Sequence, residues 1–362
     1  MGWFNKRWQT HLPPFVLVGG VGMKRLRKIA FWGVGIVLLG WLIHNVGIAS
    51  AWTQVRMMGW GYIPILFIAF CWHLSNTWAW AVCFDPKLPR PNIWSLFRTK
   101  MSGEAVGNVT PASHVGGEVA KAYMLRDQIS VTQGIPSLVV NKTIEMVSGL
   151  VFALAGACVA VWQFSLPIEV QVGLGMALFL GSLGIVTAFI SQRQNTFVWL
   201  VNLLGRLRLT FLESRREKFV EMDRAIAAFY KHNRKGFGWC LGLHILSWVL
   251  GTFEVYAILH LLEQPQPFAS AFLFMSLSLV INTAFFFIPS GVGVFEIGQV
   301  FLFQLLGLTA DLGLGVALIR RIRKVFWVTF GFVLMVLRRR NKGDKTPLSI
   351  DAPISADIPK TP

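Results

Sequence analysis

The 362-residue chain is too apolar for an ordinary soluble domain. Hydrophobic residues make up 54% of it and charged residues only 14%, whereas a soluble domain carries about 25% charged residues. The chain has a net charge of +17. Its basic residues flank apolar runs instead of covering one face of a domain. That placement argues against nucleic acid as a partner and is typical of a membrane protein.

Eight apolar segments predict membrane segments along the chain. A helix needs roughly 20 apolar residues to cross about 30 Å of hydrocarbon. Six segments reach that length, at 29–48, 63–84, 136–164, 170–190, 237–262 and 268–288. A shorter one at 292–308 and a last one at 325–337, which follows a charged stretch, complete the set. We therefore expect an all-α polytopic membrane protein with about 7–8 membrane segments.

Basic residues mark one side of the membrane. The stretch 191–236 holds ten Lys and Arg residues against four acidic ones. Further basic clusters lie at 24–28, 87–100 and 338–345, whereas Arg56 is the only Lys or Arg near 49–61, 165–169 and 263–267. The positive-inside rule then predicts cytoplasmic N- and C-termini. Basic residues near the membrane are also expected to bind anionic lipid head groups.

The same boundaries predict the domain organisation. A cytoplasmic segment at 1–28 precedes one membrane domain at 29–340, and a disordered cytoplasmic tail follows at 341–362. The membrane domain is expected to have a first half at 29–190, a cytoplasmic linker at 191–236 and a second half at 237–340. Within the linker, 213–232 predicts an amphipathic helix that lies on the membrane surface or packs under the bundle.

A short phrase occurs twice, 178 residues apart. Pro111 is followed seven residues later by Glu118, and Pro289 is followed at the same spacing by Glu296, with glycines between them. The predicted topology makes the first copy accessible from the cytoplasm and the second from the opposite face. The two copies therefore predict an inverted-topology repeat with broken or re-entrant helices. The alternative is a chance match in a glycine-rich chain.

A pair of cations supports the duplication. Lys142 and Arg320 each lie 31 residues beyond the proline of their copy, in apolar surroundings. Charges, glycines and prolines are tolerated inside a membrane where they face a cavity. We therefore expect a substrate or ion pathway there. Its predicted residues are Glu104, Asn108, Pro111, Gly116, Gly117, Glu118, Lys142, Asn282, Pro289, Gly291, Gly293, Glu296, Arg320 and Arg321.

The segments around the two phrases are expected to be irregular. Residues 101–126 are too polar to span and predict two short helices, broken at Pro111 and at Gly116-Gly117. Residues 268–308 are expected to be either re-entrant or two full spans.

The basic cluster at 320–324 leaves two interpretations. Either the last helix begins well before the cluster, with arginines facing a wet interior, or the cluster marks an interface after a re-entrant segment. These cations are suited to hold a phosphate or to form internal ion pairs. Lys142 is equally consistent with a local pair to Glu145, and Glu254 and His244 with buried pairing.

Catalytic and cofactor motifs are missing from the sequence. No Ser/His/Asp arrangement, HExxH motif or P-loop occurs. His114 and Glu118 have a metal-ligand spacing but lack a further His or Cys partner. We expect no cofactor, no metal and no enzymatic activity.

The two phrases together resemble the membrane domain of lysylphosphatidylglycerol synthase and its stand-alone relatives, which include the hopanoid-biosynthesis-associated membrane proteins. The resemblance covers roughly residues 24–340. It implies a multi-pass protein of the bacterial inner membrane, of the flippase type, that moves a phospholipid or a hopanoid-related lipid between leaflets. Because the soluble aminoacyl-transferase domain of the synthase has no counterpart in this sequence, aminoacyl transfer is not expected.

Two other functions fit the same sequence. One is a non-transporting scaffold that binds lipid-biosynthesis enzymes. The other is a membrane-embedded transferase that uses a lipid-linked donor, although its cytoplasmic loops would be expected to carry acidic pairs and these loops are basic.

Overall fold

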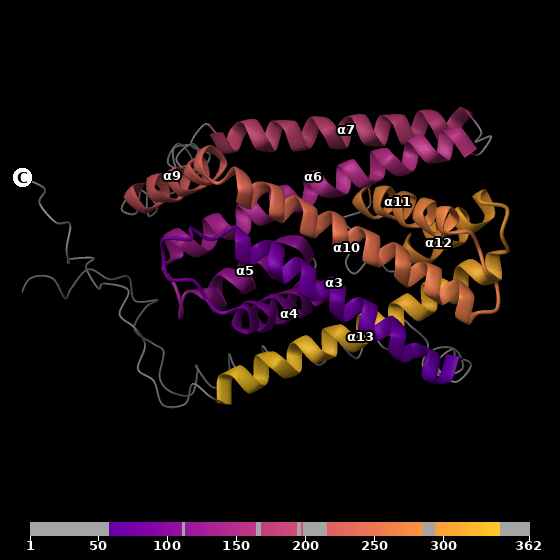
Figure 1. Ribbon diagram of the computed structural model, residues 1–362, viewed down its shortest axis with the longest axis horizontal. Coiled ribbons are helices and arrows are strands. Elements are labelled where there is room, and N and C mark those ends of the chain that lie inside the picture. Colours follow the sequence, from indigo (N-terminus) through magenta and orange to yellow (C-terminus); the bar gives the residue numbers. More distant parts are fainter. Residues whose placement is uncertain are drawn as a thin grey trace, which may run out of the picture. The chain divides into compact units, whose positions relative to one another are not determined.

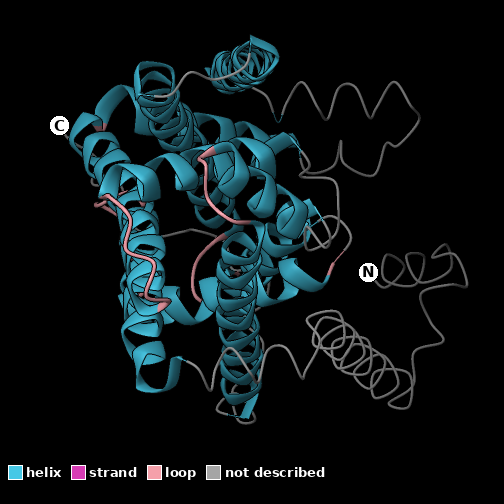
Figure 2. Cartoon of the chain, turned by 90° about the vertical axis from the view of Figure 1, so that its right-hand side faces the viewer, coloured by secondary structure: helices cyan, strands magenta, loops and turns pink. Residues whose placement is uncertain are grey.

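Helices form all of the secondary structure in the part of the chain that the structure describes. The computed structural model describes residues 58–110, 113–163, 168–193, 197, 216–284 and 294–340. In this part no strand occurs, as Figure 2 shows. The predicted segment at 29–48 and the tail at 341–362 lie outside the described residues. The described helices all belong to one compact unit, 46–362.

Four described helices are long and apolar enough to cross a membrane (Figure 1). They are α3 (Tyr62–Val82), which the short turn η2 (Gly59–Gly61) precedes, α6 (Val131–Gln163), α7 (Ile168–Arg193) and α10 (Arg234–Leu261). Each corresponds to a predicted span. At 1.5 Å per residue, even the 21 residues of α3 reach about 30 Å. The prediction of an all-α polytopic membrane protein is therefore confirmed.

Two pairs of shorter helices interrupt these long ones. The first pair is α4 (Ile93–Val109) and α5 (Ser113–Leu125), and the second is α11 (Phe268–Ala284) and α12 (Val294–Leu305). Asn92 begins α4, because its side chain accepts a hydrogen bond from the Ser95 amide at 2.7 Å. The 12 residues of α12 span only about 18 Å, too little to cross hydrocarbon alone.

The prediction that Gly116 and Gly117 break the first pair of helices is wrong. Both lie inside α5, which begins at Ser113, whereas α4 ends at Val109. Their role is contact: a Cβ on Gly117 would lie 2.9 Å from the Gly103 carbonyl oxygen and 3.4 Å from Gly107 Cα. Because glycine has no side chain, Gly117 on α5 and Gly103 and Gly107 on α4 allow the two helices to pack closely.

The last helix, α13 (Ala310–Arg340), begins well before the basic cluster. The expected span at 325–337 is therefore the second half of a 31-residue helix. Arg320 and Arg321 lie within it and are each only 7% exposed. This agrees with the first of the two interpretations of the cluster.

The helix boundaries follow the repeat. Adding 178 to the bounds of α4, α5 and α6 gives 271–287, 291–303 and 309–341, within a few residues of α11, α12 and α13. The packing is exchanged in the same way, because α4 packs on α13 while α6 packs on α11. These contacts are the ones that an inverted-topology repeat predicts.

Helices α3 and α10 form the contact between equivalent elements of the two halves, and they run antiparallel. At one end the Cys83 and Cys240 sulfurs lie 3.5 Å apart. At the other, a Cβ on Gly61 would lie 2.7 Å from a methyl of Leu261. Two helices that a two-fold axis in the membrane plane exchanges must be antiparallel, so this contact also fits the repeat.

A hydrogen-bonded histidine joins these two helices to α6. His244 of α10 lies 2.9 Å from Asn76 Oδ1 on α3 and 3.1 Å from Asn141 Oδ1 on α6, one ring nitrogen to each. His244→Leu removes both bonds and leaves the buried Asn76 amide and the half-buried Asn141 amide without them, so we expect it to destabilise the protein by about 2 kcal/mol. Thermal unfolding in detergent measures this, and His260→Leu at an exposed position is the control. Equal midpoints for the two variants would contradict the proposed role of the network.

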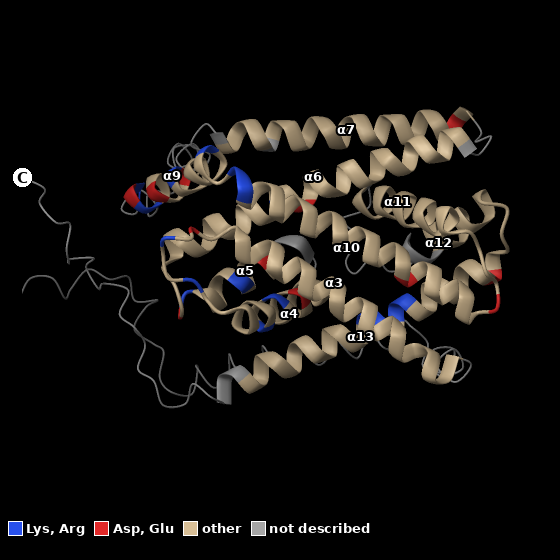
Figure 3. Cartoon of the chain, viewed as in Figure 1, with Lys and Arg blue, Asp and Glu red and all other residues tan. Residues whose placement is uncertain are grey.

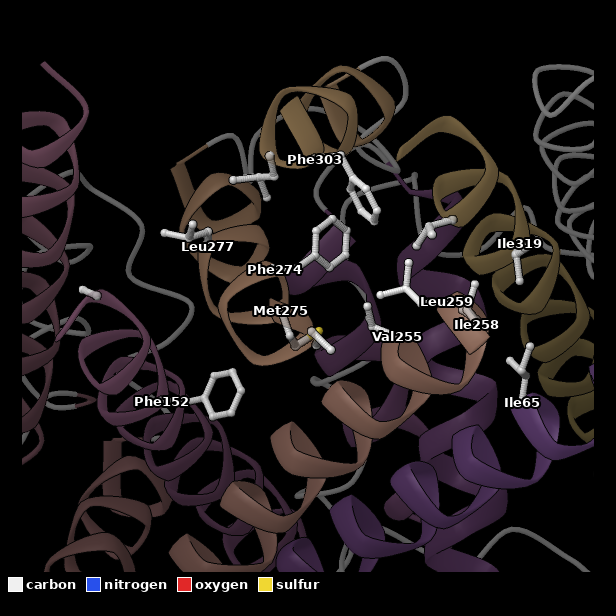
Figure 4. Packing of buried hydrophobic residues seen from close by; sticks show 14 of the residues in the cluster. Ile65, Phe152, Val255, Ile258, Leu259, Phe274, Met275, Leu277, Phe303 and Ile319 are labelled. Carbon is white, nitrogen blue, oxygen red and sulfur yellow. The ribbon is translucent and has the colours of Figure 1, made fainter. Parts of the chain in front are cut away.

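The largest apolar cluster lies where α10, α11, α12 and α13 meet (Figure 4). Phe274 of α11 and Phe303 of α12 pack edge to face with centroids 4.6 Å apart. Val255 and Ile258 of α10 and Ile319 of α13 complete its centre. This cluster packs the first half of α13 against α10.

The predicted amphipathic helix is α9 (Arg216–His232). Its apolar face packs on α6 and buries Met222, Ile226 and Phe229. Tyr230 donates a hydrogen bond to Gln192 at the end of α7, at 3.0 Å. Of the two expected positions, α9 therefore takes the one against the bundle.

Candidate functional site

A cavity of about 230 Å³ lies between α3, α4 and α13. It lies near the middle of both α3 and α13, so it is well away from the ends of these helices. The residues that line it are Trp72, His73, Met101, Glu104, Ala105, Asn108, Arg323, Lys324, Trp327 and Val328. Charged and aromatic side chains thus meet in the interior of an otherwise apolar bundle.

Helical spacing brings these side chains to one place. On α4, Lys100, Glu104 and Asn108 follow one another at four-residue steps and share a face. On α13, Trp327 and Val328 lie one turn after Arg323 and Lys324, so these side chains lie on the same side of the helix. Figure 3 shows charged residues interrupting α4 and α13, whereas the middle of α7 carries none.

A glycine allows α13 to approach α4. A Cβ on Gly331 would overlap the Met101 carbonyl oxygen and lie 2.9 Å from Ala105 Cβ. The Ser102 hydroxyl donates to the Gly331 carbonyl at 3.2 Å across this contact. The close contact lies one turn beyond Trp327 and closes one side of the cavity.

His73 and Glu104 line one wall of the cavity, and Lys100 contacts both of them. Lys100 Nζ lies 2.6 Å from Glu104 Oε1, and His73 Nδ1 lies 3.3 Å from Glu104 Oε2. His73 Nδ1 is also 3.2 Å from Lys100 Nζ. Lys100 is 5% exposed and its ammonium lies 5.2 Å from the ring of Trp72. The carboxylate therefore compensates a cation that would otherwise be buried without a partner.

The opposite wall, on α13, is basic. Arg323 donates to Glu254 Oε2 on α10 at 2.6 Å, and the Glu254 side chain is only 3% exposed. Lys324 lines the cavity beside it. Glu254 compensates Arg323 and Lys100 compensates Glu104, so Lys324 leaves this wall cationic, and its donors suit a ligand that carries negative charge.

Arg320 points elsewhere in the protein. Its guanidinium donates to Gln299 Oε1 on α12 at 3.2 Å and to the Met275 sulfur at 3.5 Å. Gln299 in turn donates to the Ser278 hydroxyl at 3.0 Å. This cation thus links α13 to α11 and α12 and does not line the cavity.

The structure brings together only part of the predicted pathway. Glu104 and Asn108 line the cavity. Glu118 instead pairs with Lys121 on its own helix at 2.8 Å, and Lys142 pairs with Glu145 at 3.1 Å. Asn282 is exposed on α11.

The remaining members of the predicted pathway fall outside the described residues. Pro111, Pro289, Gly291 and Gly293 are among them, as is the side chain of Glu296 within α12. Their assignment to a shared pathway stays a prediction.

Several cavity residues were not predicted. Trp72 and His73 lie in a segment that reads as an ordinary span, and Trp327 lies in the last one. Lys100, which contacts both His73 and Glu104, lies directly before the predicted polar segment at 101–126. Two signals were available: a histidine inside an apolar span, and the four-residue spacing of Lys100 and Glu104.

The arrangement is suited to bind a charged group between the helices. In the ranges that the structure describes, no three His, Cys, Asp or Glu side chains gather in a way that could bind a metal ion. The cavity offers guanidinium and ammonium donors, one carboxylate and two indole rings. These groups match the polar head of an amphipathic molecule better than a fully apolar ligand.

Comparison with known proteins places the chain in a family. Searches of the curated proteins and of the solved structures gave no match. The model of the family described as lysylphosphatidylglycerol synthase TM region matches residues 28–331, which include every residue that lines the cavity. The chain therefore belongs to the family of the lysylphosphatidylglycerol synthase TM region.

Proposed function

We propose that this protein is a lipid translocase of the flippase type. It moves a polar-headed lipid, either a phospholipid or a hopanoid-related lipid, between the leaflets of the bacterial inner membrane. It does so without enzymatic chemistry of its own. The observation that carries the proposal is the charged cavity near the middle of α3 and α13 in a membrane protein of a lipid-related family.

The physical problem in lipid translocation is the head group. A charged group near the centre of a bilayer costs several kcal/mol unless it meets a partner. Arg323 and Lys324 on one wall and Glu104 on the other supply partners of both signs. The acyl chains need no such help, because they can remain in the lipid while the head group occupies the cavity.

The repeat supplies a route to alternating access. Many secondary transporters carry their site at the interface of two inverted repeats that rock against each other. Here the cavity lies between α3 and α4 of the first half and α13 of the second. We infer that relative motion of the halves at 29–190 and 237–340, which the linker at 191–236 joins, exposes the cavity to one leaflet and then to the other.

Charge placement supports an orientation for this transporter. We propose that both termini and the basic linker face the cytoplasm, where they bind anionic lipid head groups. Enzymes of lipid biosynthesis are the partners that would supply the transported lipid.

Neutralising the cavity carboxylate tests the proposal. We expect Glu104→Gln to slow leaflet exchange about tenfold or more, because it leaves the buried Lys100 ammonium without its counter-charge and changes the charge of the lining. The measurement is exchange of fluorescent phospholipids in proteoliposomes, read as accessibility to a reductant outside the vesicle. Glu169→Gln, at an exposed position on α7, is the matched control and should keep the exchange rate.

The outcomes separate the candidate functions. Exchange that survives Glu104→Gln would remove the cavity from the transport route. If no candidate lipid exchanges in the unmodified protein, a non-transporting scaffold becomes the better account. Formation of a new lipid from a lipid-linked donor would instead support the embedded transferase.

A further inference from the structure

His73 has a feature that the translocase proposal does not use. Its ring lines the cavity and lies between two indoles, with centroids 4.7 Å from Trp72 and 4.9 Å from Trp327. It is only 6% exposed. Histidine is the side chain that most readily gains or loses a proton near neutral pH. A histidine that faces a cavity for a charged ligand is therefore positioned to link ligand binding to proton binding.

The surroundings of Nδ1 satisfy both of its protonation states. Lys100 Nζ lies 3.2 Å away and can only donate, whereas Glu104 Oε2 lies 3.3 Å away and, as a carboxylate oxygen, accepts. One ring nitrogen cannot accept from Lys100 and donate to Glu104 at the same time. Without a proton, Nδ1 accepts from Lys100. With a proton, it donates to Glu104 Oε2, while Lys100 stays bonded to Oε1 at 2.6 Å. A proton that arrives at Nδ1 therefore exchanges one hydrogen bond for another.

The charge of the lining decides when that proton is favoured. Lys100 and Glu104 compensate each other, and Glu254 compensates Arg323, so an imidazolium adds one positive charge to a cavity that Lys324 also lines. Like charges in a poorly solvated space repel one another strongly. An anion in the cavity offsets this repulsion and so favours the imidazolium.

Other ionisable groups around α3 have bonds of their own. On α10, Glu254 is bonded to Arg323, and His244 contacts Asn76 and Asn141. The remaining charged groups are paired on α5, as Lys121 with Glu118, and on α6, as Lys142 with Glu145. His73 is therefore the group in the described cavity lining whose charge can change with the smallest rearrangement.

We propose that His73 takes up a proton when an anionic lipid head group enters the cavity, so that lipid and proton bind together. This inference rests on the proposed translocase function and adds a coupling ion to it. Linkage makes the effect reciprocal: a proton on His73 tightens anion binding by the same factor by which the anion tightens proton binding. Affinity for an anionic lipid should then fall as pH rises, by at most about tenfold per pH unit for one proton.

Proton uptake on lipid binding tests the coupling. The full-length protein is purified in a neutral detergent, and fluorescent phosphatidylglycerol is added in weakly buffered solution with a pH indicator. Fluorescence anisotropy reports lipid binding, and the indicator reports the protons taken up. We expect about one proton per bound lipid for the unmodified protein. Phosphatidylcholine, which has no net charge, should cause much less uptake.

Two histidine variants complete the experiment. His73→Asn keeps an amide near the position of Nδ1, where it can still accept from Lys100 but cannot become a cation. We expect it to bind phosphatidylglycerol with no proton uptake and with little dependence on pH. His260→Asn, at an exposed position on α10, is the control and should behave like the unmodified protein.

Two results would overturn the coupling while leaving the translocase proposal intact. One is equal proton uptake by His73→Asn and the unmodified protein, and the other is binding of phosphatidylglycerol without any uptake. If phosphatidylglycerol does not bind at all, the cavity is no anion site and the coupling fails as well. Leaflet exchange in proteoliposomes then judges the translocase proposal separately.

Discussion

Gly331→Ala is expected to destabilise the protein by about 3 kcal/mol, even though alanine favours a helix over glycine by about 1 kcal/mol. The added Cβ would overlap the Met101 carbonyl oxygen and crowd Ala105 Cβ. A backbone carbonyl in α4 cannot rotate away, so α13 must move as a whole. That movement would separate Trp327 from the apolar cluster that it forms with Phe97 and Met101. Thermal unfolding in detergent should show a midpoint lower by roughly 4 °C.

Gly181→Ala supplies the matched control. Gly181 lies in α7, and a Cβ at this position would meet nothing within 4 Å. The substitution should therefore leave stability unchanged or raise it by up to about 1 kcal/mol, since only helix propensity changes. Similar midpoints for Gly331→Ala and Gly181→Ala would mean that α4 and α13 are not packed through this glycine.

The equivalent pair of helices, α6 and α11, gives a second check. A Cβ on Gly156 of α6 would overlap the side chain of Ser276 on α11, so α6 meets α11 through a glycine as α13 meets α4. If Gly156→Ala is as destabilising as Gly331→Ala, both contacts between the halves depend on the same kind of close approach.

Local sequence signals were sufficient for the helices and the repeat. The length of an apolar run is a local property, and the spacing of Pro111 and Pro289 already contained the offset that relates α4, α5 and α6 to α11, α12 and α13. The amphipathic pattern of α9 was equally local. These elements could be predicted because each depends on its own residues.

The site could not be predicted in full because it depends on contacts between distant helices. His73 lies in an apolar span, and its contact with Glu104 forms only because α4 packs against that span. Glycines were a second difficulty: Gly117 looked like a break, but its contact with Gly103 on α4 keeps it inside a helix. Whether a glycine ends a helix or packs one depends on its neighbour in space, which a single sequence does not contain.

The basic cluster at 320–324 also depends on contacts between distant helices. A helix that continues through Arg320 and Arg323 requires partners, and these come from Gln299 on α12 and Glu254 on α10. Sequence alone left an interfacial position equally open, because these partners lie on other helices. A buried cation is acceptable only where such partners meet it.

Glu254→Ala is therefore expected to destabilise the protein by about 3–5 kcal/mol, because it leaves the Arg323 guanidinium without its counter-charge in the bundle. The Glu254 side chain is 3% exposed, so water cannot readily replace it. Glu169→Ala is the control, since this carboxylate lies at an exposed position in the first turn of α7. It should change the free energy of unfolding by no more than about 1 kcal/mol.

The double variant Glu254→Leu with Arg323→Met separates stability from transport. Replacing both members of a buried ion pair with apolar side chains of similar size often leaves stability unchanged or improved, so its unfolding midpoint should return close to that of the unmodified protein. Lipid exchange by the double variant should stay below that of the unmodified protein, because one of the two cations on the α13 wall of the cavity is gone. A stable double variant that still exchanges lipid would show that Arg323 only compensates Glu254, and that head-group recognition depends on Lys324 and Glu104.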